Sequence, residues 1–204
     1  MSIRISVAIC ALLLGLPCAP ALADDAALRT ALEAARRDFE ARGPAGLDRL
    51  DLDAVQTVCN RWANNPPSEL QSLLQAEQLA AVKYPEGGNY LGDWKKGEAL
   101  AQSGRGLTWS DGAKVATGGN CYNCHELAST ELAYGTLGPS LARYGQRRGR
   151  SPDLLRYTWA KIYNAKASSL CSNMPRFGHS GALGEAQIRH IMAYLFDPQS
   201  PVNR

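Results

Sequence analysis

The pentapeptide Cys121-Tyr122-Asn123-Cys124-His125 constrains this chain more than any other stretch of its 204 residues. C-x-x-C-H is the attachment motif of a c-type haem. Two thiols at this spacing can each add to a vinyl group of one porphyrin, and the histidine that follows is carried beneath the iron as its proximal ligand. A zinc site would need a second Cys/His pair at ligand spacing, and a thioredoxin-like dithiol would need a βαβ pattern; neither is evident. The motif therefore predicts one covalently bound haem c.

The first 23 residues have the composition of an export signal. A basic start precedes an apolar run, Val7–Leu16, and residues 21–23 form an A-x-A cleavage pattern. The apolar run is shorter than the about 20 residues that cross a bilayer. Pro17 replaces the small residue that would precede a lipidated Cys18. We therefore expect a cleaved signal peptide over residues 1–23, no membrane anchor, and a mature protein in an oxidising compartment, a bacterial periplasm.

Size and charge limit the remaining classes of function. Removing the signal peptide leaves 181 residues, enough for one domain with an extension. It also leaves 21 basic against 19 acidic side chains, a formal charge of +2 that haem propionates would largely offset. This balance predicts neither nucleic-acid binding nor attachment to a membrane surface.

Residues 24–88 predict an N-terminal helical extension of three amphipathic helices. The first helix is expected to begin at a cap at Asp24-Asp25 and to end at Gly43-Pro44. The second is expected to begin near Asp51 and to end at Asn64-Asn65-Pro66-Pro67. The third is expected to begin at Pro67 or Ser68, and a linker follows it at Tyr84–Gly88. These helices serve either as packing or as a docking surface for a partner, and amphipathic periodicity does not separate the two.

Residues 89–204 predict a second all-α unit built around the motif. One helix is expected from about Asp93 to Ser103, before the motif, and another over Glu185–Leu195, near the end of the chain. Gly97 in the first helix and Tyr194 in the last would let the two cross closely. This order of helix, C-x-x-C-H, loop and final helix resembles the class I cytochrome c fold.

The resemblance to that fold gives a role to the segment Leu137-Gly138-Pro139-Ser140-Leu141. In the class I fold a proline carbonyl accepts a hydrogen bond from the Nδ1–H of the proximal histidine. The resemblance thus implies that Pro139 supports His125 in this way. A bond of this kind fixes the ring orientation and makes the ligand more basic.

Two methionines and two further histidines of the mature chain could close the distal side of the iron. Met192 lies on the apolar face of the final helix, which predicts that it is a core residue. His190 lies on the same helix and is expected to point outwards. Met174 lies in a non-helical segment that Pro175 stiffens. It is therefore not part of the apolar face of a helix, and packing of such a face does not account for it. We predict Met174 as the axial ligand, with His179 as the alternative. His/Met ligation favours ferrous iron, suits a one-electron acceptor, and leaves no open position for oxygen.

Cys59 and Cys171 remain once the signal peptide and the haem have taken the other four cysteines. An even pair in an oxidising compartment predicts a disulfide, which would join the N-terminal helices to the loop that carries Met174. Closing so long a loop contributes about 3–5 kcal/mol in the chain-entropy model. The alternative makes Cys171 a free thiolate that handles sulfur near the haem.

Basic residues gather at Arg143–Arg150. A solvated loop explains them, and the alternatives are neutralisation of propionates, guidance of an anionic substrate or docking of an acidic partner. Arg176, close to Met174, is the better candidate for a contact with a haem propionate or a substrate.

Four segments together resemble SoxX, the family of monohaem cytochrome subunits in the SoxAX complexes of bacterial sulfur oxidation. They are Gly119–His125, Leu137–Leu141, Met174–Gly178 and Ala193–Asn203. The strings M-P-R-F-G and D-P-x-S-P-V-N are far more selective than C-x-x-C-H alone. The resemblance covers residues 89–204 and does not extend to the N-terminal helices.

The resemblance implies a periplasmic heterodimer with a SoxA-like cytochrome subunit. In such a complex thiosulfate is coupled oxidatively to a cysteine of a SoxYZ-like carrier, at a cysteine-ligated haem of the SoxA subunit. Making that S–S bond releases two electrons, whereas one haem iron accepts one. This chain would then be the electron-transfer subunit of an L-cysteine S-thiosulfotransferase-type enzyme, without a catalytic residue of its own, and would pass electrons to a soluble cytochrome.

Two other classes of function stay open at this point. A free periplasmic electron carrier would be a monomer with an exposed haem edge. An enzyme or gas sensor in its own right would need a vacant or easily displaced sixth ligand.

Overall fold

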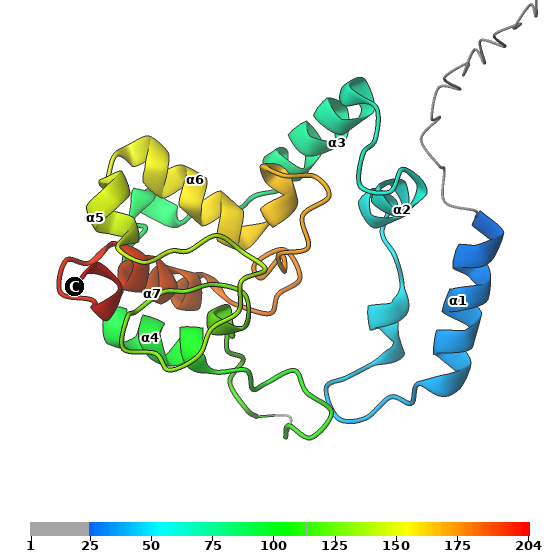
Figure 1. The fold of residues 1–204 in the computed structure, drawn as a ribbon, viewed down its shortest axis with the longest axis horizontal. Coiled ribbons are helices and arrows are strands. Elements are labelled where there is room, and N and C mark those ends of the chain that lie inside the picture. The colour runs from blue at the N-terminus through cyan, green and yellow to red at the C-terminus, as the bar shows by residue number, and fades with distance from the viewer. Residues whose placement is uncertain (1–24, 113) are drawn as a thin grey trace, which may run out of the picture.

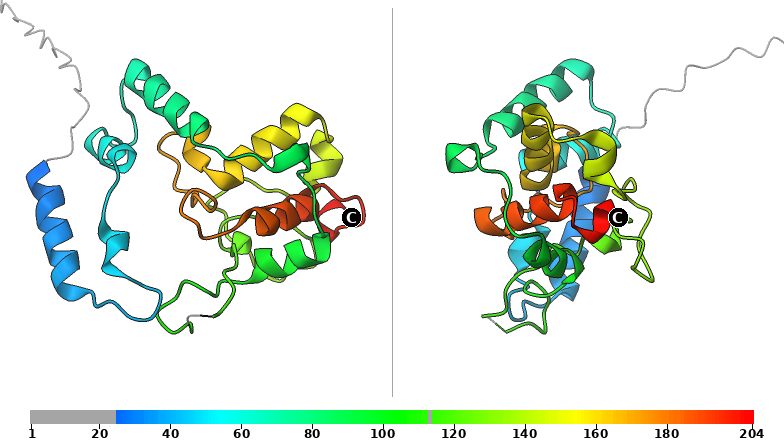
Figure 2. Two further views of the ribbon diagram at one scale, coloured as in Figure 1. Left: turned by 180° about the vertical axis from the view of Figure 1, so that it is seen from behind. Right: turned by 90° about the vertical axis from the view of Figure 1, so that its left-hand side faces the viewer.

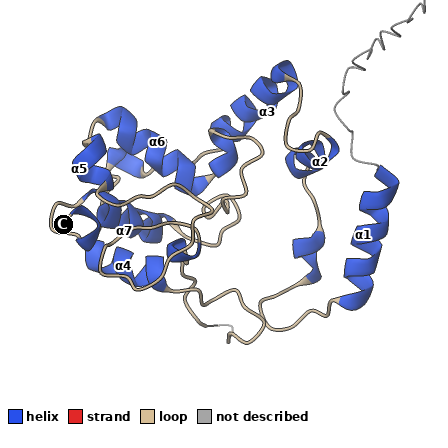
Figure 3. Cartoon of the chain, viewed as in Figure 1, coloured by secondary structure: helices blue, strands red, loops and turns tan. Residues whose placement is uncertain are grey.

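The computed structural model describes residues 25–112 and 114–204 (Figure 1), and the predicted signal peptide, residues 1–23, lies outside them. Regular structure in these residues is helical, joined by loops (Figure 3), which confirms the all-α prediction. Arg42 and Ala45 form an isolated backbone bridge. None of the described helices is both long and apolar enough to span a bilayer.

Seven α-helices follow one another along the described residues. They are α1 (Asp25–Asp38), α2 (Ala54–Arg61), α3 (Ser68–Ala80), α4 (Trp94–Gln102), α5 (Tyr144–Arg148), α6 (Pro152–Tyr163) and α7 (Glu185–Phe196). The helix predicted before the haem motif is therefore confirmed as α4, and the one predicted near the end of the chain as α7. Each stops within one residue of its expected C-terminal end.

Local sequence explains where the helices of the C-terminal part begin. The Asp93 side chain accepts the Lys95 N–H at 2.9 Å and caps α4. Ser151 caps α6 in the same way, and Pro152 occupies its first turn, where a missing N–H costs nothing. α5 and α6 lie where no helix was predicted, although Ser151 and Pro152 are an ordinary start signal.

Helices α4 and α7 lie side by side (Figure 2), and their backbones come close together at Gly97. A Cβ atom at Gly97 would lie 2.0 Å from the carbonyl oxygen of His190 and 2.8 Å from the Cβ of Tyr194. Only a residue without a side chain allows the backbones to meet here. The close crossing predicted from Gly97 and Tyr194 is confirmed.

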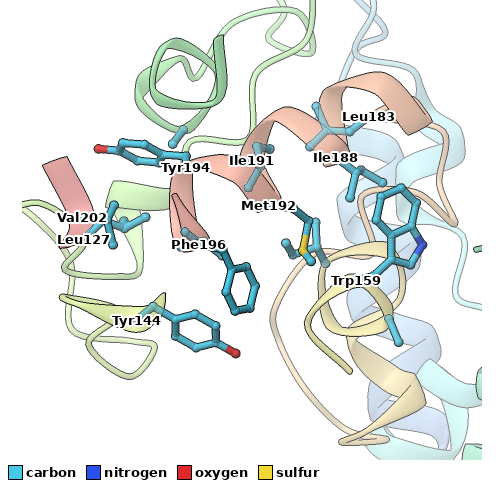
Figure 4. Packing of buried hydrophobic residues seen from close by; sticks show 14 of the residues in the cluster. Leu127, Tyr144, Trp159, Leu183, Ile188, Ile191, Met192, Tyr194, Phe196 and Val202 are labelled. Carbon is cyan, nitrogen blue, oxygen red and sulfur yellow. The ribbon is translucent and has the colours of Figure 1, made fainter. Parts of the chain in front are cut away.

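The main core forms where α7 meets α6 and the loop after the haem motif (Figure 4). Trp159 of α6 and Ile188, Met192 and Phe196 of α7 are each no more than 1% exposed. Their apolar surfaces supply most of the driving force that holds the helices together. Met192 is thus core, as predicted.

Two boundaries in the N-terminal segment differ from the prediction. α1 ends at Asp38 rather than at Gly43-Pro44, and Arg42 and Ala45 pair through their backbones in a tight turn beyond it. α2 begins at Ala54, where the Asp53 side chain accepts the Gln56 N–H at 2.8 Å and the Gln56 side chain returns the bond. This capping box fixes the start of α2 three residues beyond the expected one.

The third helix of the extension is tied to α6 and the turn that follows it. The Trp159 Nε1–H donates to the carbonyl oxygen of Lys83 at 2.8 Å, and the Asn164 side chain donates to Gln78 at 3.0 Å. Because both partners on the α6 side are buried, these bonds hold α3 and the segment that follows it against the C-terminal part of the molecule.

Replacement of Gly97 tests the crossing of α4 and α7. Gly97→Ala is expected to lower the free energy of unfolding by about 1–3 kcal/mol, because the new methyl group meets backbone atoms that cannot move away. Urea unfolding of the intact protein measures this difference. Gly112→Ala is the control, since the nearest atom to its Cβ is 4.0 Å away. Equal stability of the two variants would contradict the crossing.

Candidate haem site

The haem motif forms one tight turn. Cys121–Asn123 is a short 3₁₀ helix, and the N–H groups of Cys124 and His125 donate to the Cys121 carbonyl oxygen at 3.1 and 2.9 Å. Asn120, just before it, has the left-handed backbone angles φ 45° and ψ 45°, which asparagine adopts more readily than most residues. The turn therefore presents two thiols and an imidazole from five consecutive residues.

The motif is fixed to α4 by its preceding backbone. The N–H of Gly119 donates to the carbonyl oxygen of Leu100 at 2.8 Å, and that of Asn120 donates to Ser103 at 3.0 Å. A Cβ at Gly119 would lie 3.2 Å from the Cys121 Sγ, so glycine leaves room around this thiol. These bonds place the motif at the C-terminal end of α4.

A second link joins the motif to α7 through Tyr122, the first of its two variable residues. The hydroxyl groups of Tyr122 and Tyr194 lie 2.7 Å apart, and the Tyr122 oxygen also accepts the Ala128 N–H at 3.3 Å. Burial raises the pKa of both tyrosines above the ordinary value, so both stay neutral and hydrogen-bonded. The motif is thereby held between the two helices that cross at Gly97.

His125 is oriented by a backbone carbonyl. Its Nδ1 lies 2.7 Å from the carbonyl oxygen of Pro139. Because a carbonyl can only accept, Nδ1 carries the proton and the lone pair is on Nε2. Gly138 lies against the ring, since a Cβ there would be 2.2 Å from the Cε1 of His125. This is the arrangement that the resemblance to the class I fold implies for Pro139.

The loop that supplies Pro139 follows the motif closely. The N–H of Gly135 donates to the Tyr122 carbonyl oxygen at 2.7 Å, and that of Gly138 donates to the Cys124 carbonyl oxygen at 2.8 Å. Leu137 lies next to these contacts and is 89% exposed. Two backbone bonds therefore hold this loop against the motif.

The two motif cysteines suit covalent attachment better than redox or zinc chemistry. Neither Cys121 nor Cys124 is in a disulfide. Burial raises the pKa of Cys121 to about 12, whereas a catalytic dithiol needs a lowered thiol pKa. No group of three or more His, Cys, Asp or Glu residues gathers around a common point in residues 25–112 and 114–204, so no zinc ligand set forms there. The residues present fit a c-type haem.

The predicted disulfide is confirmed. Cys59 of α2 and Cys171 are bonded, with Cα atoms 5.5 Å apart and 112 positions between them in the sequence. The alternative, a free Cys171 thiolate, is wrong because that sulfur is used in the bond. The N-terminal extension is thus covalently joined to the segment that carries Met174.

Met174 lies half-buried against the main core, on a loop between the 3₁₀ turn at Ala165–Ala167 and α7. Its N–H donates to the Ser172 hydroxyl at 3.2 Å. His179, the alternative ligand, is exposed. His190 is half-buried rather than directed into solvent, and its Nδ1 accepts the Asp93 N–H at 2.9 Å, which ties α7 to the cap of α4. Ligation of iron by Met174 stays a prediction.

Arg176 has a partner that the sequence did not suggest. Its guanidinium lies 2.5 Å from the Asp53 carboxylate, at the cap of α2, and only 17% of its side chain is exposed. The proposed contact with a propionate stays a prediction. An ion pair between residues so far apart in the sequence leaves no pattern from which it could be predicted.

The basic segment Arg143–Arg150 is only partly a loop. Tyr144–Arg148 forms the short helix α5, and the Arg148 guanidinium lies over the rings of Tyr144 and Tyr157, at 5.4 and 5.9 Å. The segment expected to be a solvated loop is therefore solvated, since its arginines are exposed, but five of its residues are helical. Arg148 thus makes cation–π contacts with two aromatic rings of its own surroundings.

No family model matches the chain. It is 43% identical over 129 residues to an uncharacterized lipoprotein of Aquifex aeolicus (strain VF5), an alignment that covers 63% of this chain. The chain spans 61% of the length of that relative.

The pair of buried tyrosine hydroxyls can be tested by a double-mutant cycle. Tyr122→Phe is expected to cost about 1–3 kcal/mol of stability, because the Tyr194 hydroxyl and the Ala128 N–H lose their partner. Adding Tyr194→Phe should cost less in that variant than in the wild type, and urea unfolding of all four proteins measures the difference. Strictly additive costs would show that the two hydroxyls do not interact.

Proposed function

We propose that this chain is an exported monohaem c-type cytochrome with a class I cytochrome c fold and an N-terminal helical extension. One observation carries the proposal: two free thiols and an imidazole share one turn, and the Pro139 carbonyl holds His125 with its Nε2 lone pair free. A bound haem would supply a one-electron iron couple.

Each residue has a distinct role towards the haem. Cys121 and Cys124 tether it, and His125 is the proximal ligand through Nε2. Pro139 fixes the ring and increases its basicity by accepting the Nδ1–H. Met174 is the distal ligand, whose thioether favours the ferrous state and raises the reduction potential.

We propose further that the chain is a SoxX-like subunit that works beside a SoxA-like cytochrome in a heterodimer. It would accept electrons one at a time while thiosulfate is coupled to a cysteine of a SoxYZ-like carrier, and would pass them to a soluble cytochrome. The M-P-R-F-G and D-P-x-S-P-V-N strings support this assignment. The two electrons of that coupling exceed the capacity of one haem, which is why the chain would act as one subunit of an enzyme.

Export to the periplasm is part of the proposal. It is supported by the signal-like composition of residues 1–23 and by a relative that is itself named a lipoprotein. The confirmed disulfide also suits an oxidising compartment. Pro17 before Cys18 disfavours a lipid anchor on this chain.

Replacement of Met174 tests the axial ligand. Met174→Ala is expected to abolish the methionine-to-iron absorption band of the oxidised protein and to lower its reduction potential, because the thioether no longer reaches the iron. Met192→Leu is the control, since Met192 is fully buried in the core and leucine keeps its volume. Retention of the band in Met174→Ala would overturn the assignment.

Purification from the source organism tests the partner. An affinity-tagged chain taken from the periplasm at low salt is expected to bring a second haem protein in a stoichiometric ratio, and haem counted per mole of complex gives that ratio. Isolation of the chain as a monomer with a single haem would instead identify a free electron carrier.

A further inference from the structure

Two long-range links hold the loop that carries Met174, and both lead to α2. The disulfide from Cys59 reaches Cys171, three residues before Met174, and the carboxylate of Asp53 reaches Arg176, two residues after it. We call residues 171–176 the methionine loop. The loop is therefore fastened on both sides of its methionine to a helix of the N-terminal extension.

The other bonds of the methionine loop are local. The N–H of Ser172 donates to Ser169, that of Met174 donates to the Ser172 hydroxyl, and the carbonyl of Arg176 accepts from Ser180. Bonds between near neighbours shape a loop but do not fix it to the rest of the molecule.

The segment after the loop is held differently. Gly178 donates to the carbonyl oxygen of Tyr163 at 3.1 Å, and the carbonyl oxygen of Phe177 accepts the Leu183 N–H at 3.0 Å. Those bonds join it to the end of α6 and to the segment before α7. From Phe177 onwards the chain is therefore held by the C-terminal part of the molecule. In the methionine loop Met174 packs on the main core, while the residues on both sides of it are linked to α2.

A small apolar cluster supports the attachment at Cys171. Val55 and Cys59 of α2 and Leu170 are each no more than 4% exposed, and they form a cluster apart from the main core. Burial of these side chains keeps α2 against the chain just before the methionine loop. Cys59 is thus buried in this cluster, and Cys171 is half-buried beside it.

Side chains of α2 do not pack directly on the methionine loop around Met174. A cavity of about 430 Å³ lies between α2 and the methionine loop, lined by Gln56 and Asn60 from the helix and by Met174 and Arg176 from the loop. Because this space is not filled by side chains, the helix restrains the loop chiefly through its two links. Removing a link should therefore release the loop.

We propose that α2 is a positioning element for the distal haem ligand. Asp53 acts through Arg176, and Cys59 acts through Cys171, to keep the thioether of Met174 on the iron. This inference rests on the proposed function, in which Met174 is that ligand. The N-terminal extension then limits how readily the distal ligand leaves and a foreign ligand enters.

The variant Asp53→Asn isolates the charge of the ion pair. Asparagine caps a helix as well as aspartate does, so α2 keeps its start while the charged contact to Arg176 is lost. Losing a hydrogen bond between charged groups weakens the attachment of the loop by enough free energy to change an equilibrium about tenfold. We therefore expect an external ligand to enter about ten times faster. Asp51→Asn is the matched control, because Asp51 lies two residues away and pairs with Arg36 of α1.

The experiment uses the full-length oxidised holoprotein and imidazole as the entering ligand, followed by loss of the methionine-to-iron band in a stopped-flow spectrometer. Asp53→Asn should accelerate imidazole entry about tenfold, and Asp51→Asn should match the wild type. In the background Arg176→Gln, adding Asp53→Asn should change the rate no further. Dependence on Arg176 distinguishes positioning through that residue from a general loss of stability.

The outcomes separate this inference from the proposed function. If the wild type has no methionine-to-iron band, the ligand assignment to Met174 fails first. If the wild type has the band and Asp53→Asn takes up imidazole at the wild-type rate, the assignment stands and the positioning role of α2 is wrong. A faster rate for Asp53→Asn that persists unchanged in the Arg176→Gln background would also overturn the role, because Asp53 would then act by another route.

Discussion

The close approach of α4 and α7 at Gly97 is the constraint on which the haem motif depends. The end of α4 binds the backbone before Cys121, and Tyr194 of α7 binds the hydroxyl of Tyr122. A side chain at position 97 would push the two helices apart and strain both sets of bonds. The position of the motif between the two helices therefore relies on a residue without a side chain at the crossing, and the Pro139 carbonyl then sets the direction of the His125 imidazole.

The two sides of the proposed haem site are built in different ways. The proximal side is formed by neighbouring segments, since Pro139 is only 14 residues from His125 and its loop follows the motif through backbone bonds. The methionine loop, which would supply the distal ligand, is instead joined to α2 by a disulfide and an ion pair. Under the proposed function, two ligands fastened in this way would suit a centre that changes charge without changing its ligands.

The sequence predicted the parts of this structure that carry a local or chemical signature. α4 and α7 have periodic apolar faces with end signals, and the Cys59–Cys171 bond follows from cysteine count and compartment. α6 was not predicted despite its proline start, because the basic residues of Arg143–Arg150 just before it are typical of a solvated loop. The pair of Asp53 and Arg176 was beyond prediction, since only the folded chain brings α2 to the methionine loop.

Covalent attachment of haem is the central claim, and intact mass spectrometry of the exported protein under denaturing, reducing conditions tests it most directly. The account predicts a mass that exceeds the polypeptide by one haem, with the haem on the peptide that contains Cys121 and Cys124 and with neither thiol open to alkylation. A polypeptide of unmodified mass, exported with intact folding and with both thiols alkylated, would contradict the account.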